Sequence, residues 1–146
     1  MYETYTKQSL PTKEYRELVG TALCVFCSNN AFMIENIIKT DDYYDWYDLM
    51  DKESGGLKND ISKTISQNSN DEIFNLFSEI VTMRNRIFHS FRITSEDGEQ
   101  ILATKTQKRD GNIQFHITKE YLMEFINKND KLSDLLYQYR RDKSLK

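Results

Sequence analysis

The most regular pattern of apolar and polar positions lies in residues 71–91, and it predicts one amphipathic helix over that range. With about 100° of rotation per residue, the apolar side chains fall on a single stripe, formed by Ile73, Phe77, Ile80, Ile87, Phe88 and Phe91. Arg84 falls near the middle of this stripe. Because a guanidinium keeps its charge and is rarely buried without a partner, Arg84 requires an acceptor, a polar cleft or a second subunit.

A long helix is predicted before this segment. Ser9-Leu10-Pro11-Thr12 is a helix start signal, with the proline in the first turn, and the apolar stripe that follows extends to about residue 39. Asn29 and Asn30 interrupt that stripe. These two amides indicate either a kink or solvated gap in the helix, or side chains that line the same polar cleft as Arg84.

The remaining helices are shorter or lie at the end of the chain. Residues 41–51 are acidic and rich in aromatic side chains, and they predict a short helix whose rings pack inward. Residues 57–67 predict a second short helix with apolar residues at a spacing of four. Thr118 is a suitable cap for a last long helix, in which the polar residues 127–130 are a candidate kink.

Between the last two long helices the pattern changes to short β-segments. Residues 101–106 and 113–117 have β-character, and the second range alternates between apolar and polar side chains. Residues 108–112 contain Asp-Gly, which is a strong hairpin signal. The sequence therefore predicts a mainly α fold, an antiparallel helical bundle with a β-hairpin at about residues 99–118, in one domain over residues 1–146.

Composition supports a globular, helical chain. Hydrophobic residues make up 38% of the sequence and charged residues 29%, which is unlike a disordered protein. One proline and five glycines favour long helices over many turns. No run approaches the ~18 consecutive apolar residues of a membrane span, and the first residues lack the pattern of a secretory signal. We therefore expect a cytoplasmic protein with no membrane partner.

Charge is distributed unevenly along the chain. Residues 1–60 carry eleven acidic and six basic side chains, a balance of −5, whereas residues 84–119 carry seven basic and four acidic ones, a balance of +3. The net charge of −3 argues against nucleic-acid binding by the whole surface. A local basic surface near Arg84 is one interpretation of this asymmetry, and an ordinary solvated face is the other.

The sequence contains no convincing metal or redox motif. Cys24 and Cys27 form a Cys-x-x-Cys pair inside the first predicted helix, whereas redox pairs of this kind require a helix N-terminus. A zinc site needs about two further ligands, and His89 and His116 are the only histidines. We interpret the cysteines as core residues and expect no metal ion and no cofactor.

The segment Arg84-Asn85-x-x-x-His89 resembles the arginine, polar residue, three spacers and histidine motif of the HEPN superfamily (higher eukaryotes and prokaryotes nucleotide-binding). The resemblance covers six of 146 residues. It implies a small helical bundle with the motif late in its third helix. It also implies metal-independent endoribonuclease activity, often in a toxin or an antiviral defence effector, at a composite site to which each subunit of a dimer supplies an arginine and a histidine. Many members of this superfamily are not catalytic.

The chemistry of these residues suits such a reaction. RNA carries its own nucleophile, the 2′-hydroxyl, and histidine side chains titrate in the range useful for proton transfer. Arginine suits a phosphate and the charge of its transition state. We therefore expect Arg84, Asn85 and His89 to be catalytic, with Asn85 orienting His89 or the phosphate. Further RNA contacts are predicted for basic side chains of the same region, namely Arg86, Arg92, Lys105, Lys108 and Arg109.

The expected partners are RNA, a second copy of the chain in a homodimer, and an antitoxin or regulatory protein. A different function also fits the sequence. In this alternative, the chain is a non-catalytic helical module that binds a nucleotide, a nucleic acid or a protein partner through the same cleft.

Overall fold

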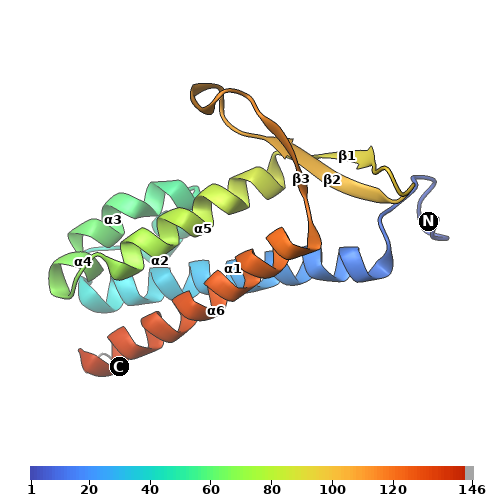
Figure 1. The fold of residues 1–146 in the computed structure, drawn as a ribbon. Coiled ribbons are helices and arrows are strands. Elements are labelled where there is room, and N and C mark those ends of the chain that lie inside the picture. The colour runs from blue at the N-terminus through green and yellow to red at the C-terminus, as the bar shows by residue number, and fades with distance from the viewer. Residues whose placement is uncertain (144–146) are drawn as a thin grey trace.

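The computed structural model describes residues 1–143 of the chain. Three long helices lie along one another, and a small sheet extends beyond one end of them (Figure 1). The long helices are α1 (Lys13–Thr40), α5 (Glu72–Phe88) and α6 (Lys119–Asp142). Four short elements connect α1 to α5, namely α2 (Trp46–Asp51), η1 (Ser54–Leu57), α3 (Lys58–Lys63) and α4 (Ile65–Asn68). The fold is thus mainly helical, as predicted.

The directions of the long helices follow from contacts between their side chains. At one end, Lys119 of α6 forms an ion pair with Glu14 of α1 at 2.8 Å. At the other end, the Thr40 and Tyr139 hydroxyls lie 2.6 Å apart. α1 and α6 are therefore parallel. α5 runs in the opposite direction between them in the chain, so that successive long helices are antiparallel (Figure 1).

A buried amide pair joins α1 to α6 near their middle. The Asn29 amide donates to the backbone carbonyl of Asn129 at 2.7 Å and to its side-chain oxygen at 3.0 Å. Both residues are buried, with 6% and 1% of their surface exposed. Because buried polar groups are costly unless they are paired, this contact explains why a polar residue interrupts the apolar stripe of α1. α6 continues without a break through the polar range 127–130.

The sheet has three antiparallel strands in the order β1-β2-β3. β2 (Gln100–Lys105) and β3 (Gln114–Ile117) form the predicted hairpin, with η2 (Lys108–Asp110) at its turn. β1 (Phe91–Thr94) was not predicted, because Phe91 continues the apolar stripe of the preceding helix. The structure corrects this, since α5 ends at Phe88 and Phe91 pairs with Ala103 of β2.

Tyr15 fixes the sheet to the start of α1. Its hydroxyl donates to the carbonyl of Ile117 at 2.5 Å and accepts from the amide of Leu102 at 3.1 Å. These two bonds join α1 to β3 and β2 over more than eighty residues of sequence. The hairpin is thereby held next to the start of α1.

Three further expectations were wrong. The helix predicted over residues 57–67 is divided into η1, α3 and α4, with a break at Thr64 whose φ and ψ are −119° and −82°. The rings of Tyr43 and Tyr47 are exposed rather than packed inward. Cys24 and Cys27 are free thiols on the exposed face of α1, not core residues.

α1 is also long and apolar enough to cross a membrane by length and composition alone. Its most apolar window has a mean hydropathy of 1.3, and 28% of that window is buried in the fold. A core helix passes the same test, and α1 packs along α6 here. The cytoplasmic location therefore stays a prediction.

Candidate functional site

Arg84 lies on α5 with its guanidinium between two aromatic rings. Its Cζ atom is 4.3 Å from the ring centroid of Phe88 and 5.5 Å from that of Phe26 on α1. Both contacts are within the range of cation–π attraction. Nη1 donates to the side-chain oxygen of Asn85 at 3.1 Å. Nε is buried and has no hydrogen-bond partner in the described chain.

Among residues 1–143, Arg84 forms no ion pair with a carboxylate. The expected need for an acceptor is therefore met only in part, by one amide oxygen. A guanidinium has five donors, so most of the hydrogen-bonding capacity of Arg84 stays free within one copy of the chain. This leaves Arg84 able to bind an anion or a group from another molecule.

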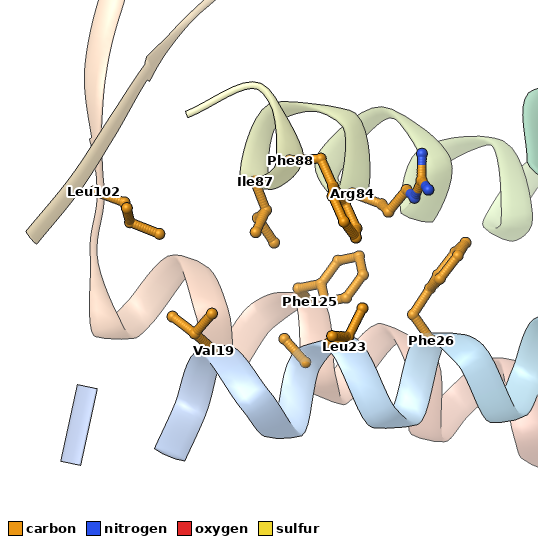
Figure 2. A pocket seen from close by; sticks show the side chains of 9 residues that line it. Val19, Leu23, Phe26, Arg84, Ile87, Phe88, Leu102 and Phe125 are labelled. Atoms are coloured by element: carbon orange, nitrogen blue, oxygen red, sulfur yellow. The ribbon is translucent and has the colours of Figure 1, made fainter. Parts of the chain in front are cut away.

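The guanidinium borders a cavity of about 200 Å³, here called the apolar pocket. Its walls come from α1, α5, α6 and β2, and Figure 2 shows their side chains converging on it. Leu23 and Phe88 line the apolar pocket and are themselves 46% and 53% exposed. The complete lining is Val19, Ala22, Leu23, Phe26, Arg84, Ile87, Phe88, Leu102 and Phe125. Arg84 is thus the single charged group on an otherwise hydrocarbon wall.

His89 stands at the C-terminal end of α5 rather than inside the helix. Its backbone N–H donates to the carbonyl of Asn85 at 2.9 Å, and its own carbonyl accepts from the Thr104 hydroxyl at 2.9 Å. The backbone is held by these bonds, while the imidazole is exposed. His89 does not line the apolar pocket. Arg84 and His89 are therefore both accessible, but they do not share a cavity within one copy.

A different face of α5 borders a second cavity, here called the polar cleft, with a volume of about 370 Å³. The polar cleft lies between α5, the start of α3, the hairpin and the first turn of α6. Its chemically distinctive lining residues are Lys58, Asn85, Arg86, Arg109, Phe115 and Tyr121. Asn85 thus contacts Arg84 and also lines the polar cleft.

The five basic residues proposed for RNA contacts are in different settings. Arg86 and Arg109 line the polar cleft. Arg92 donates to the backbone carbonyl of Ser9, and the Lys105 ammonium donates to the Asn112 side chain at 2.7 Å. Lys108 is exposed at the hairpin turn. The structure therefore brings two of the five together and leaves three outside the cleft.

Asn29 and Asn30, which we considered as cleft-lining residues, are used elsewhere. Asn29 is buried against Asn129, and Asn30 accepts a hydrogen bond from the Ser54 hydroxyl at 3.1 Å. Neither lines the apolar pocket or the polar cleft.

Sequence reasoning missed Lys58, Phe115 and Tyr121 of the polar cleft. Burial raises the pKa of Tyr121 to about 12, with a further increase from Glu124 and a decrease from the nearby Arg86. The Tyr121 hydroxyl therefore stays protonated at neutral pH. No local pattern marks these residues, because they come from three elements that only the tertiary fold brings together.

Residues 1–143 contain no group of three or more His, Cys, Asp or Glu side chains placed to hold a metal ion. The sequence matches no family model, and comparisons with curated proteins and with solved structures give no match.

Proposed function

We propose that this protein is a metal-independent endoribonuclease of the HEPN type, which cleaves RNA through attack by the 2′-hydroxyl at a site completed by two copies of the chain. Its role would be that of a toxin or an antiviral defence effector. The observation that carries the proposal is the state of Arg84, which has the motif spacing to Asn85 and His89 and no carboxylate partner among residues 1–143. The competing explanation, a buried structural ion pair, requires that partner.

In this mechanism Arg84 binds the scissile phosphate and stabilises the charge that develops in the transition state. His89 accepts the proton of the 2′-hydroxyl or donates a proton to the leaving 5′-oxygen. Asn85 holds the guanidinium through the 3.1 Å hydrogen bond. The products are a 2′,3′-cyclic phosphate and a 5′-hydroxyl, because the nucleophile belongs to the substrate.

The dimer in this proposal is supported by exposed apolar side chains around Arg84. Leu23, Phe88 and Phe91 are 46%, 53% and 44% exposed, and the first two line the apolar pocket. Exposed apolar clusters of this kind are typical of interaction surfaces. A two-fold interface pairs the same surface of both copies, so each apolar pocket would be covered and the two motifs would lie near one axis.

The test is cleavage of total RNA by the purified protein in EDTA, with the wild type compared with His89→Ala. We expect the wild type to produce fragments that end in 2′,3′-cyclic phosphate and the variant to lose activity by ~10²–10⁴-fold. His116→Ala is the matched control, because His116 is the other histidine, is also exposed and lies on β3. Equal rates for the wild type and His89→Ala, with both folded by circular dichroism, would exclude His89 from catalysis.

The second candidate function is the non-catalytic module that binds a partner. The apolar lining of the pocket favours it, because a hydrocarbon wall suits a protein side chain better than a phosphate. A wild type that forms a stable complex with RNA or protein and leaves RNA intact would favour this alternative.

A further inference from the structure

The polar cleft has the charge and the surfaces needed to hold one unstacked nucleotide of an RNA strand. Lys58, Arg86 and Arg109 line it against one acidic residue, Asp110. Arg109 lies 3.8 Å from the Asp110 carboxylate, whereas Lys58 has no ion-pair partner among the described residues. The cleft therefore carries excess positive charge in a protein whose net charge is −3. An anionic ligand is the complement of such a cavity.

The guanidinium of Arg86 is already oriented at the wall of the polar cleft. Nη1 donates to the backbone carbonyl of Lys105 at 2.5 Å, which fixes the side chain against the end of β2 next to the hairpin turn. Its remaining donors form no other hydrogen bond within residues 1–143. A planar guanidinium held in this way suits the paired oxygens of a phosphate.

An aromatic pair forms another part of the lining. The rings of Phe115 on β3 and Tyr121 on α6 have centroids 5.8 Å apart and are tilted by 52°. Both are half-buried, so each ring is held in place and keeps an accessible surface. Aromatic rings next to cations are the usual platform for unstacked bases, because every base has a π-face and every nucleotide has a phosphate. The protonated Tyr121 hydroxyl adds a hydrogen-bond donor at the same place.

We propose that the polar cleft binds a single-stranded segment of the RNA substrate, with one phosphate on Lys58 and Arg86 and the adjacent base against Phe115 and Tyr121. This inference rests on the proposed ribonuclease function and adds the substrate class to it: RNA that is single-stranded next to the cleaved bond. A duplex cannot present an unstacked base to the two rings. The hairpin therefore acts as one wall of the binding path rather than as a separate RNA-binding arm.

The experiment separates binding from cleavage. A fluorescein-labelled single-stranded 12-mer with 2′-O-methyl riboses lacks the nucleophile, so its binding can be measured by fluorescence anisotropy whether or not the protein cleaves RNA. We expect Lys58→Gln/Arg86→Gln to weaken binding at least tenfold and to reduce the slope of log affinity against log salt by about 0.7, because the one phosphate contact shared by the two cations is lost. Lys39→Gln is the matched control, because Lys39 is an exposed lysine near the end of α1 that lies away from the hairpin (Figure 1).

A second pair of variants tests the aromatic wall. Tyr121→Ala is expected to weaken binding of the 12-mer about tenfold through lost stacking, whereas Tyr121→Phe keeps the ring and should stay within about threefold of the wild type. Thermal melts confirm that both variants are folded. The same 12-mer annealed to its complement should bind the wild type at least tenfold more weakly than the single strand.

Three results would overturn the inference. These are equal affinity of the double cation variant and the wild type, equal affinity for duplex and single strand, and equal affinity of Tyr121→Ala and the wild type. Absence of RNA cleavage by the wild type, together with cleft-dependent binding of the 12-mer, would instead refute the ribonuclease proposal and leave the single-strand site standing.

Discussion

Replacement of Arg84 by methionine should separate stability from function. Where a buried arginine is paired with a carboxylate, removal of the arginine leaves the carboxylate unpaired and costs ~3–5 kcal/mol of the free energy of unfolding. Arg84 has no such partner among residues 1–143. We therefore expect Arg84→Met to abolish RNA cleavage while the fold keeps nearly all of its stability.

The contacts of Arg84 give the expected magnitude. The two cation–π contacts, at 4.3 and 5.5 Å, are worth together about 1–2 kcal/mol. The hydrogen bond from the charged guanidinium to Asn85 is worth about 1.5 kcal/mol, the lower end of the range for charged donors because the pair is only part-buried. Against this loss, the variant removes a buried Nε without a partner, which relieves about 1–3 kcal/mol. A methionine also restores sulfur contacts to both rings, at ~0.3–1.5 kcal/mol. The terms nearly cancel, and the free energy of unfolding should change by less than about 1 kcal/mol.

Urea unfolding followed by circular dichroism measures this difference. Two protein concentrations are needed, because the unfolding midpoint of a dimer depends on concentration. Arg140→Met is the control for activity, since Arg140 also lies over an aromatic ring, that of Phe32, at 4.9 Å, but far from the motif and, unlike Arg84, beside a carboxylate, that of Glu35, at 3.6 Å. Its cleavage activity should equal that of the wild type. A loss of more than ~3 kcal/mol in Arg84→Met would refute the reasoning, because it would reveal a structural partner for the guanidinium.

The remaining predictions concern the helix pair and the tyrosines. Asn29→Ala should lower the free energy of unfolding by about 2–3 kcal/mol in urea, because it removes two buried hydrogen bonds and leaves the Asn129 side-chain oxygen unpaired; a change below about 0.5 kcal/mol would show that the pair is solvated. Burial raises the pKa of Tyr15 above its ordinary value and that of Tyr121 to about 12. Their stabilising contribution is therefore complete below pH 10 and is lost as the pH rises through the folded-state pKa values, so urea midpoints should fall between about pH 10 and 12. Tyr121→Phe should flatten that fall, and an unchanged pH dependence would contradict the assignment.

The long helices could be predicted because their signals are local. Thr12 and Thr118 cap α1 and α6 through hydrogen bonds to the amides of Tyr15 and Tyr121. The Thr118 cap was predicted from residue type, whereas the first helix begins after Pro11 rather than with Pro11 in its first turn. β1 could not be predicted in this way. Phe91 fits the helical stripe of α5 by period alone, and its pairing with Ala103 in β2 is a long-range contact. Where local and tertiary preferences compete at the end of a helix, periodicity places the boundary too late.

The candidate site also has one part that is local in the sequence and one part that depends on the tertiary fold. The spacing of Arg84, Asn85 and His89 is a local pattern, so the sequence alone identifies it. The environment of Arg84 is not local, because Phe26 on α1 and Phe125 on α6 complete the apolar pocket. Burial and exposure also depend on the partner helix. This is why the apolar context of Cys24 suggested a core position although the residue faces outward.

Asn85 lies between the two cavities, because it lines the polar cleft and is hydrogen-bonded to Arg84, which lines the apolar pocket. Its side-chain oxygen accepts from the guanidinium of Arg84, so the oxygen faces Arg84. The amide NH₂ is then left for the polar cleft, which Asn85 also lines. An NH₂ group only donates, as do the nearby cations Lys58 and Arg86. Lys58, Asn85 and Arg86 therefore offer donors to the polar cleft, which is the chemistry that an anionic backbone such as that of RNA would use. Asn85 both accepts from Arg84 and lines the polar cleft, so a strand held in the cleft would lie one side chain away from the arginine proposed to bind its scissile phosphate.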